Sequence, residues 1–256
     1  MQGQKIIYPF AQELLSRHRA FMPYVSPSML AGYLIMMLPL SVGYLFKDNK
    51  GYFKLNLKNV LLTLPTLLIA FALFLTKSVG AFLSISLSLL LFIVLSKRFN
   101  RRNFLILLIF LLALASIFIL RSYKTEYFTS PVFSIHKRII YWQQTLSVIL
   151  KHPFRGVGLG NLPFIQSQFA HNSYLQIWAE CGLLGIVSFL GFLYKSLKAI
   201  QAKKLVADKL YGGLAIANLA FLIHSLVDFG FFLPEVSIFW WIIIGLFLSS
   251  GTQCHL

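Results

Sequence analysis

The segment Arg155–Leu184, with the sequence RGVGLGNLPFIQSQFAHNSYLQIWAECGLL, passes from a glycine-rich turn through a short polar stretch into a strongly apolar run. His171 and Asn172 stand where the apolar run begins. A histidine can gain or lose a proton near neutral pH, and at the edge of an apolar segment it can face both water and lipid. This segment therefore brings tight turns and titratable chemistry to a predicted membrane boundary.

The composition of the whole chain indicates a membrane protein built from helices. Of the 256 residues, 58% are hydrophobic and 12% are charged, whereas a soluble domain carries about 25% charged residues. Apolar runs of about 18 residues or more recur, and we therefore predict an all-α, polytopic membrane protein with about seven spans. The expected spans are residues 28–46, 59–76, 80–96, 104–120, 172–194, 211–229 and 236–250.

The positive charge of the chain predicts its orientation. A formal net charge of +16 would suggest a nucleic-acid partner in a soluble protein. Here the cations gather in three gaps between apolar runs, Lys47–Lys58, Lys97–Arg102 and Lys195–Lys209. Because loops rich in Lys and Arg stay in the cytoplasm, residues 121–171 are expected outside, and no nucleic-acid partner is expected.

We predict a single membrane domain over residues 1–256, with four spans in 27–120, a periplasmic loop in 121–171 and three spans in 172–250. This orientation puts the N-terminus outside the membrane. Either the first span inserts in that direction unaided, or the chain is the C-terminal portion of a longer protein. The second interpretation is favoured, and a second polypeptide could then supply the missing spans.

The outer loop is expected to contain an amphipathic helix followed by a turn. In His136–Lys151, the apolar residues recur at three- and four-residue spacing, which predicts a helix resting on the membrane–water boundary. They are Ile139, Trp142, Leu146 and Ile149. Gly156, Gly158 and Gly160 then indicate a turn with positive φ or a close approach of the backbone to a ligand. A dinucleotide site is not indicated, because these glycines do not follow a predicted strand.

Three polar residues of the outer region are candidates for chemistry. His171 is either a proton acceptor or a helix-entry residue, with Asn172 or Ser173 as the N-cap. Arg138 and Arg155 could each hold a phosphate through two parallel hydrogen bonds or anchor the chain to lipid headgroups.

Polar residues inside the predicted spans form a second group. His224 and Asp228 are four residues apart in the sixth predicted span, so they should share one helical face and point into the bundle as a hydrogen-bonded pair. Glu180 also lies in an apolar stretch, with no partner evident from the sequence. His, Cys and carboxylates do not recur at ligand spacing, so neither a metal nor a cofactor is expected.

A set of short motifs, taken in order, resembles the O-antigen ligase family, which includes O-antigen polymerases and related bacterial oligosaccharyltransferases. The resemblance covers almost the whole chain, and the order of the motifs is more specific than any single one. The motifs are Arg138-Ile-Ile-Tyr-Trp142, His152-Pro153, Gly156-Val-Gly158-Leu-Gly160, His171-Asn172-Ser-Tyr-Leu-Gln176, Glu180-Cys-Gly182-Leu-Leu-Gly185 and His224-Ser-Leu-Val-Asp228 with Pro234.

The resemblance implies transfer of a glycan from undecaprenyl pyrophosphate to an acceptor hydroxyl at the outer face of the bacterial inner membrane, without a metal. The acceptor would be lipid A–core, another glycan or a protein. Arg138 resembles the arginine that contacts the donor pyrophosphate, and His171 resembles the histidine that activates or orients the acceptor hydroxyl. Eight further motif residues would support the site, namely Trp142, Gly156, Gly158, Gly160, Asn172, Glu180, His224 and Asp228.

One departure from the family pattern concerns the donor site. The family often has Ser-Arg-Gly where this chain has Ser78-Val79-Gly80. Lys77, Arg17, Arg19 and Arg155 could supply the missing charge. Two other functions stay open at this point. The chain could be a truncated, non-catalytic component of a glycan assembly complex, or a polysaccharide transporter, although a transporter would need repeated halves or discontinuous helices that the sequence does not indicate.

Overall fold

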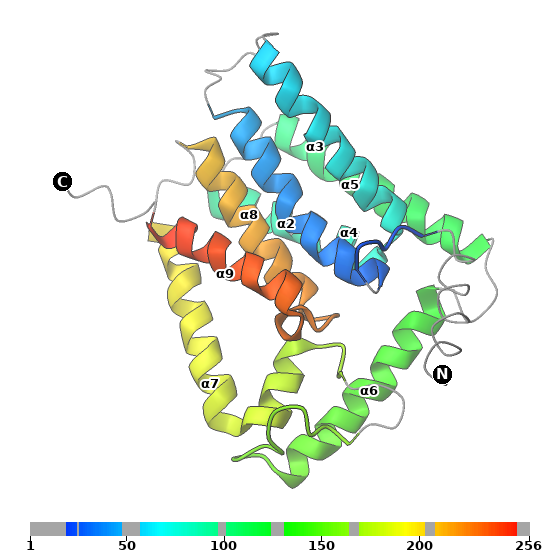
Figure 1. The fold of residues 1–256 in the computed structure, drawn as a ribbon, viewed down its shortest axis with the longest axis vertical. Coiled ribbons are helices and arrows are strands. Elements are labelled where there is room, and N and C mark those ends of the chain that lie inside the picture. The colour runs from blue at the N-terminus through cyan, green and yellow to red at the C-terminus, as the bar shows by residue number, and fades with distance from the viewer. Residues whose placement is uncertain are drawn as a thin grey trace, which may run out of the picture.

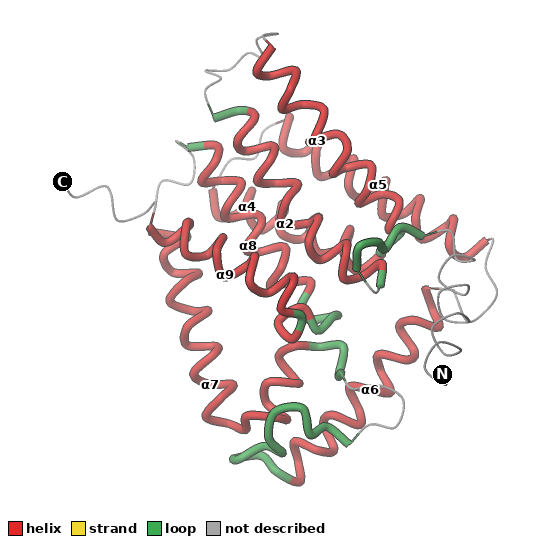
Figure 2. Tube along the Cα trace, viewed as in Figure 1, coloured by secondary structure: helices red, strands yellow, loops and turns green. Residues whose placement is uncertain are grey.

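The computed structural model describes residues 19–24, 26–47, 57–96, 101–123, 131–163, 169–202 and 208–249. All regular structure within these ranges is helical (Figures 1 and 2). The helices are α2 (Pro27–Leu45), α3 (Leu57–Thr76), α4 (Val79–Ser96), α5 (Arg101–Tyr123), α6 (Pro131–Lys151), α7 (Ser173–Ala202), α8 (Lys209–His224) and α9 (Pro234–Ser249), with a 3-10 turn, η2 (Gly230–Phe232), before α9. Arg17, one of the cations considered for the donor site, lies outside the described residues.

The all-α class predicted from the apolar runs is confirmed. Among the described residues, three helical segments are long and apolar enough to cross a membrane, namely Pro27–Leu45, Val79–Ser96 and Ser173–Lys198. Four shorter apolar helices accompany them, namely Val60–Thr76, Phe104–Leu120, Lys209–His224 and Pro234–Ser249. A bilayer core of about 30 Å takes roughly 20 helical residues, so these lengths and compositions describe a helical membrane protein.

Helix α8 is the centre of the bundle, because α2 and α4 pack along it and most of its side chains are buried (Figure 1). Two glycines allow the closest approach between helices. A Cβ atom added at Gly43 of α2 would lie 2.8 Å from the carbonyl oxygen of Lys209, and one added at Gly213 of α8 would lie 3.3 Å from the Cα atom of Gly43. Such contacts between small residues are typical of helix packing in membranes, where dispersion and close backbone approach replace the hydrophobic effect.

Aromatic side chains join α8 to α9. Trp240 of α9 is fully buried and stacks on Phe221 of α8, with ring centroids 5.5 Å apart. Phe231, in η2, meets both rings nearly edge-on at 4.8 and 4.9 Å. These rings fix the turn between the two helices, which also carries Asp228.

Helix α6 begins five residues earlier than the sequence predicted, at Pro131, because proline suits the first turn of a helix. Its C-terminal half packs on α7 through a small apolar cluster of Val148, Ile149, Leu162 and Ala179. Figure 1 shows α6 and the first part of α7 meeting below the bundle. Residues 131–163, packed on the first part of α7, thus form a folded unit with its own small core.

An exposed apolar stripe runs along α6. Ile139 and Leu146, which the sequence placed on the apolar face of this helix, are exposed, whereas Ile149 is buried against α7. Val132, Ile135 and Leu150 extend the exposed stripe at helical spacing. An exposed stripe of this kind is typical of a helix that lies on a membrane surface.

Helix α7 is broken at Gly182, where φ is 69° and ψ is −169°. This is a conformation that glycine adopts and other residues avoid. The turn after α6 fills the break, since Val157 N–H donates to the carbonyl of Ala179 at 2.9 Å and Leu183 N–H donates to the carbonyl of Pro153 at 3.0 Å. This discontinuity was not predicted from the sequence.

We expect Gly182→Ala to destabilise the protein by about 2–4 kcal/mol, since the new methyl group would overlap the carbonyl of Phe154 and force a strained φ. Gly191→Ala, in the same helix, is the matched control. A Cβ atom there would meet nothing within 4 Å, so the change should shift stability by less than about 1 kcal/mol. Thermal unfolding in detergent, followed by circular dichroism, measures both, and equal shifts would contradict the structure.

Candidate active site

His171 lies at the start of α7 in an uncommon backbone conformation. Its φ is +51°, a left-handed value that histidine and asparagine adopt more readily than most residues. Asn172 follows as the N-cap, and its side-chain oxygen accepts from the N–H groups of Tyr174 and Leu175, both at 3.0 Å. The predicted cap at Asn172 is therefore confirmed, and the cap together with the positive φ turns the His171 side chain away from the helix axis.

Aromatic residues hold the imidazole ring of His171 from two sides. Tyr141 of α6 stacks on it at 5.5 Å between centroids, and Phe229 meets it edge-on at 4.8 Å. The indole N–H of Trp142 donates to the His171 carbonyl at 3.3 Å. Trp142, expected to support the site, thus contacts the backbone of the histidine, while its neighbour Tyr141 contacts the ring.

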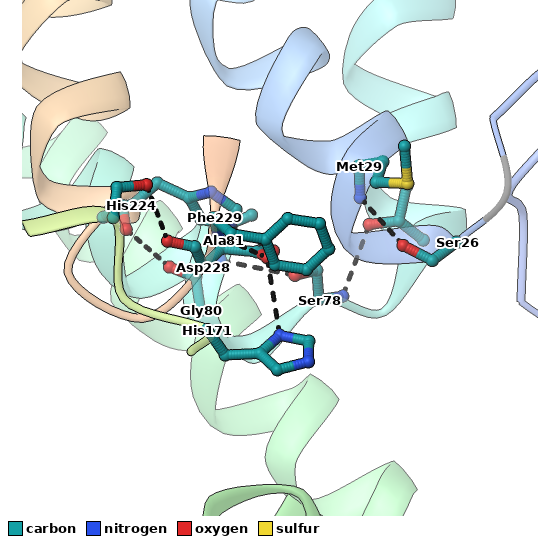
Figure 3. A network of polar contacts seen from close by, with 12 residues as sticks. Ser26, Met29, Ser78, Gly80, Ala81, His171, His224, Asp228 and Phe229 are labelled. Atoms are coloured by element: carbon teal, nitrogen blue, oxygen red, sulfur yellow. Dashed lines mark hydrogen bonds and ion pairs between the residues drawn. The ribbon is translucent and has the colours of Figure 1, made fainter. Parts of the chain in front are cut away.

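Asp228 lies between two histidines (Figure 3). Its Oδ1 atom is 3.8 Å from Nδ1 of His171, and its Oδ2 atom is 3.9 Å from Nε2 of His224. The carboxylate is 3% exposed and the His171 side chain is 29% exposed. At these distances the contacts are electrostatic and slightly longer than hydrogen bonds. The proximity of His224 and Asp228 agrees with the sequence prediction.

The sequence predicted this proximity because the two residues would share one face of a helix, and that reason is wrong. Helix α8 ends at His224 with Ser225 as the C-cap, so Asp228 lies in the following turn and not on a helical face. Ser173 holds this turn against α7. Its N–H donates to the carbonyls of Ser225 and Asp228 at 2.9 and 3.1 Å, and its hydroxyl donates to the Asp228 carbonyl at 3.1 Å.

The electrostatic surroundings keep Asp228 ionised. Burial alone would raise the pKa of its carboxyl, but the imidazoles of His171 and His224 and the guanidinium of Arg138 oppose burial and hold that pKa below its ordinary value. The carboxylate is therefore negative at neutral pH. It favours a proton on Nδ1 of His171, which leaves Nε2 as the basic nitrogen of the neutral ring.

Arg138 reaches this cluster from α6. Its Nη1 donates to the Ser134 hydroxyl at 3.2 Å, and its charge acts on both Asp228 and His224. Three buried polar atoms of the cluster, Arg138 Nε, His171 Nδ1 and Asp228 Oδ2, have no hydrogen-bond partner among the described residues. Such atoms are rare in folded proteins and, grouped together, are typical of sites that bind a polar ligand.

The turn between α3 and α4 borders the same cluster. Gly32 of α2 and Gly80 of α4 leave the room that His224 occupies, since Cβ atoms at these positions would lie 3.5 and 3.9 Å from its ring nitrogens. A Cβ atom added at Gly80 would also lie 3.3 Å from the side chain of Val227, the residue before Asp228. The guanidinium Nε of Arg19 donates to the carbonyl of Thr76 at 2.7 Å, so Arg19 lies at the turn that contains Lys77.

Other predicted site residues lie elsewhere. Arg155 is exposed in the turn that fills the Gly182 break. It is separated from His171 by the helix Ser173–Cys181, which is roughly 13 Å long. Glu180 is buried and accepts from the side-chain amide of Gln176 at 2.9 Å. Gly156, Gly158 and Gly160 all have positive φ, as predicted, but Gly156 closely approaches the backbone of α7.

Two residues of the site were missed by the sequence analysis. Phe229 was placed at the end of the sixth predicted span, and Tyr141 appeared only as a member of the motif that runs from Arg138 to Trp142. Both are aromatic residues adjacent to motif residues, Asp228 and Trp142, which is the signal that could have indicated them. The described part of the chain contains no group of three or more His, Cys, Asp or Glu residues placed to hold a metal ion.

The fold and this cluster define a helical membrane protein with a histidine–carboxylate pair and an arginine at one end of its bundle. Residues 64–190 match the sequence model of the O-antigen ligase family, and the chain belongs to this family. The match extends from α3 to α7 and includes both Arg138 and His171. No curated protein matches this chain.

Proposed function

We propose that the chain transfers a glycan from undecaprenyl pyrophosphate to an acceptor hydroxyl at the outer face of the bacterial inner membrane. Membership of the O-antigen ligase family supports this class of reaction. The observation that carries the proposal for this chain is the pairing of His171 with the buried Asp228, next to Arg138. The acceptor is lipid A–core, another glycan or a protein hydroxyl.

In the proposed reaction, His171 acts on the acceptor. Nε2 of the neutral imidazole accepts the hydroxyl proton as the acceptor oxygen bonds to the anomeric carbon of the donor sugar. Asp228 keeps Nδ1 protonated and stabilises the imidazolium that forms. Tyr141 and Phe229 hold the ring in one orientation, which favours attack because little freedom is lost on reaching the transition state.

Arg138 acts on the leaving group. Cleavage of the bond from the anomeric carbon to the phosphate oxygen releases undecaprenyl pyrophosphate, and negative charge builds up on that oxygen. A guanidinium already positioned beside it stabilises the charge. Arg19 and Lys77, at the turn before α4, are proposed to hold the other phosphate of the donor pyrophosphate. At the position of Val79, the family often has an arginine for this contact.

The purified chain, reconstituted with a lipid-linked glycan donor and its acceptor, is expected to transfer glycan equally well with and without excess EDTA. Cations of the protein, rather than a divalent metal, neutralise the pyrophosphate in this proposal. Gel mobility of the acceptor measures the transfer. Loss of activity with EDTA and recovery with Mg²⁺ would contradict a metal-independent reaction.

The alternative is a non-catalytic component of a glycan assembly complex, and Val79 is the observation that favours it. Its half-buried side chain packs against the core cluster to which α2, α3, α4, α5 and α8 contribute, and it cannot replace a charged contact. A chain that is inactive alone and active with a second polypeptide would support this alternative.

The orientation proposed from the charged loops places the active site outside, with seven apolar helices crossing or entering the membrane. In a chain with Cys181 and Cys254 replaced by serine, Leu159→Cys should react with a membrane-impermeant maleimide added to intact spheroplasts. Leu159 is exposed in the outer turn. Lys47→Cys, exposed at the opposite end of α2, should react only after permeabilisation, and the reverse pattern would overturn the topology.

A further inference from the structure

A cavity of about 530 Å³ lies inside the bundle, away from the His171 cluster. Helices α2, α3, α4, α5 and α8 line it, with Ala70, Leu89, Phe110 and Ile216 among the apolar side chains on its wall. Its volume is within the range of about 300–1,000 Å³ that is usual for ligand pockets.

The packing of the helices explains why this space exists. Helix α3 packs along α2, whereas α4 packs against α5 and α8. The glycines that bring α2 and α8 together, Gly43 and Gly213, also line the cavity and contribute no side chain to fill it. The cavity is therefore built into the crossing of these helices.

Water is a poor occupant of this cavity. The hydroxyl of Thr66, a polar residue of the wall, donates to the carbonyl of Leu62 in its own helix at 2.9 Å. The charged residues of the wall, Asp208 and Lys209, lie together at the start of α8. An ordered water needs two to four polar partners, and a large space without them stays dry or takes up an apolar ligand.

The polar end of the cavity is positively charged overall. The carboxylate of Asp208 already accepts from the N–H groups of Leu210 and Tyr211 as a helix cap. The ammonium of Lys209 lies 5.9 Å from the centre of the Phe46 ring. Lys47, which follows Phe46 in the chain, is exposed. Exposed Leu67 of α3 and Ile106 of α5 are at the rim, so hydrocarbon can enter from the side.

We propose that this cavity binds one acyl chain of an anionic phospholipid, with the headgroup phosphate at Lys209 and Lys47. An apolar wall with cations at one end matches the distribution of hydrocarbon and charge in such a lipid. The positive-inside orientation places that end at the cytoplasmic leaflet, opposite the leaflet where glycan transfer is proposed. The site thus holds a lipid that is not a substrate and that fills the gap between α3 and the rest of the bundle.

The test uses phosphatidylglycerol with a photoreactive diazirine in the middle of one acyl chain, added to the full chain in phosphatidylcholine nanodiscs. Labelling should saturate and map by peptide mass spectrometry to the cavity walls of α4, α5 and α8. Leu89→Trp, which fills the cavity, should lower this labelling by about tenfold. Leu90→Trp is the matched control, because the adjacent residue is exposed and does not line the cavity.

Further variants and probes separate the alternatives. Ile216→Trp fills the cavity from α8 and should act as Leu89→Trp does, with circular dichroism verifying that each variant is folded. Lys209→Gln should weaken labelling by phosphatidylglycerol and leave labelling by a neutral diacylglycerol probe unchanged. Equal labelling of wild type and both filled variants would overturn the proposal. Stronger competition by undecaprenyl phosphate than by phosphatidylglycerol would overturn the assignment to an acyl chain.

Discussion

Replacing His171 with alanine is expected to abolish glycan transfer and to leave the amount of folded protein in the membrane unchanged. A positioned general base contributes about 10²–10⁴-fold to a rate, and Asp228 cannot reach past the lost imidazole to replace it. Transfer to the acceptor in a strain lacking the native enzyme, with immunoblotting of the membrane fraction, measures both quantities.

The His171 side chain and its backbone can be tested separately. Asparagine tolerates positive φ at least as well as histidine does but cannot act as a base. His171→Asn should therefore fold normally and be as inactive as His171→Ala. His152→Ala, at an exposed histidine that follows α6, should retain activity. Normal transfer by either His171 variant would contradict the proposed role of His171 as the proton acceptor.

Replacing Arg138 with lysine should lower the rate of transfer by about 10–100-fold, although the charge is conserved. Hydrogen bonds between charged groups contribute about 1.5–3 kcal/mol, and a lysine ammonium cannot reproduce the planar two-point contact of a guanidinium with a phosphate. The loss should be largest in the rate at saturating donor, because the contact strengthens as charge develops on the leaving oxygen.

Arg155→Lys is the matched control for Arg138→Lys. Both residues precede α7 in the chain, but Arg155 is exposed at the far end of the first part of α7. It should transfer glycan at the wild-type rate. An Arg138→Lys variant as active as Arg155→Lys would indicate that Arg138 only anchors α6 to lipid headgroups.

The sequence predicted the positions of the helices more accurately than their ends. Long apolar runs report burial in lipid, and seven of the helices fall on such runs. The segment after His224 is Ser-Leu-Val-Asp-Phe, which is almost as apolar as a span, so hydropathy could not separate the end of α8 from the turn that follows. The break at Gly182 was hidden in the same way, because one glycine in an apolar run is common in membrane helices.

The candidate site was predictable only in part. Motif order singled out His171 and Arg138 as candidates. The four-residue spacing predicted that His224 and Asp228 are close, but it did so by placing both on one helix, whereas Asp228 lies in the turn after α8. The contacts that position His171 come from α6 and from the turn after α8, which are about 30 and 60 residues away along the chain. Contacts at such separations depend on tertiary packing, which one sequence without its relatives does not report.

The contact between Gly156 and the backbone at Glu180 has a practical consequence for exchanging parts between family members. A Cβ atom at Gly156 would meet the carbonyl of Glu180, and one at Gly182 would meet that of Phe154. The turn after α6 and the first part of α7 should therefore be exchanged together, as one module joined before Pro131 and after Leu183. A chimera joined at Asn172 would pack the turn after α6 of one protein against the first part of α7 of another. Acceptor preference should therefore move between proteins only with the whole module.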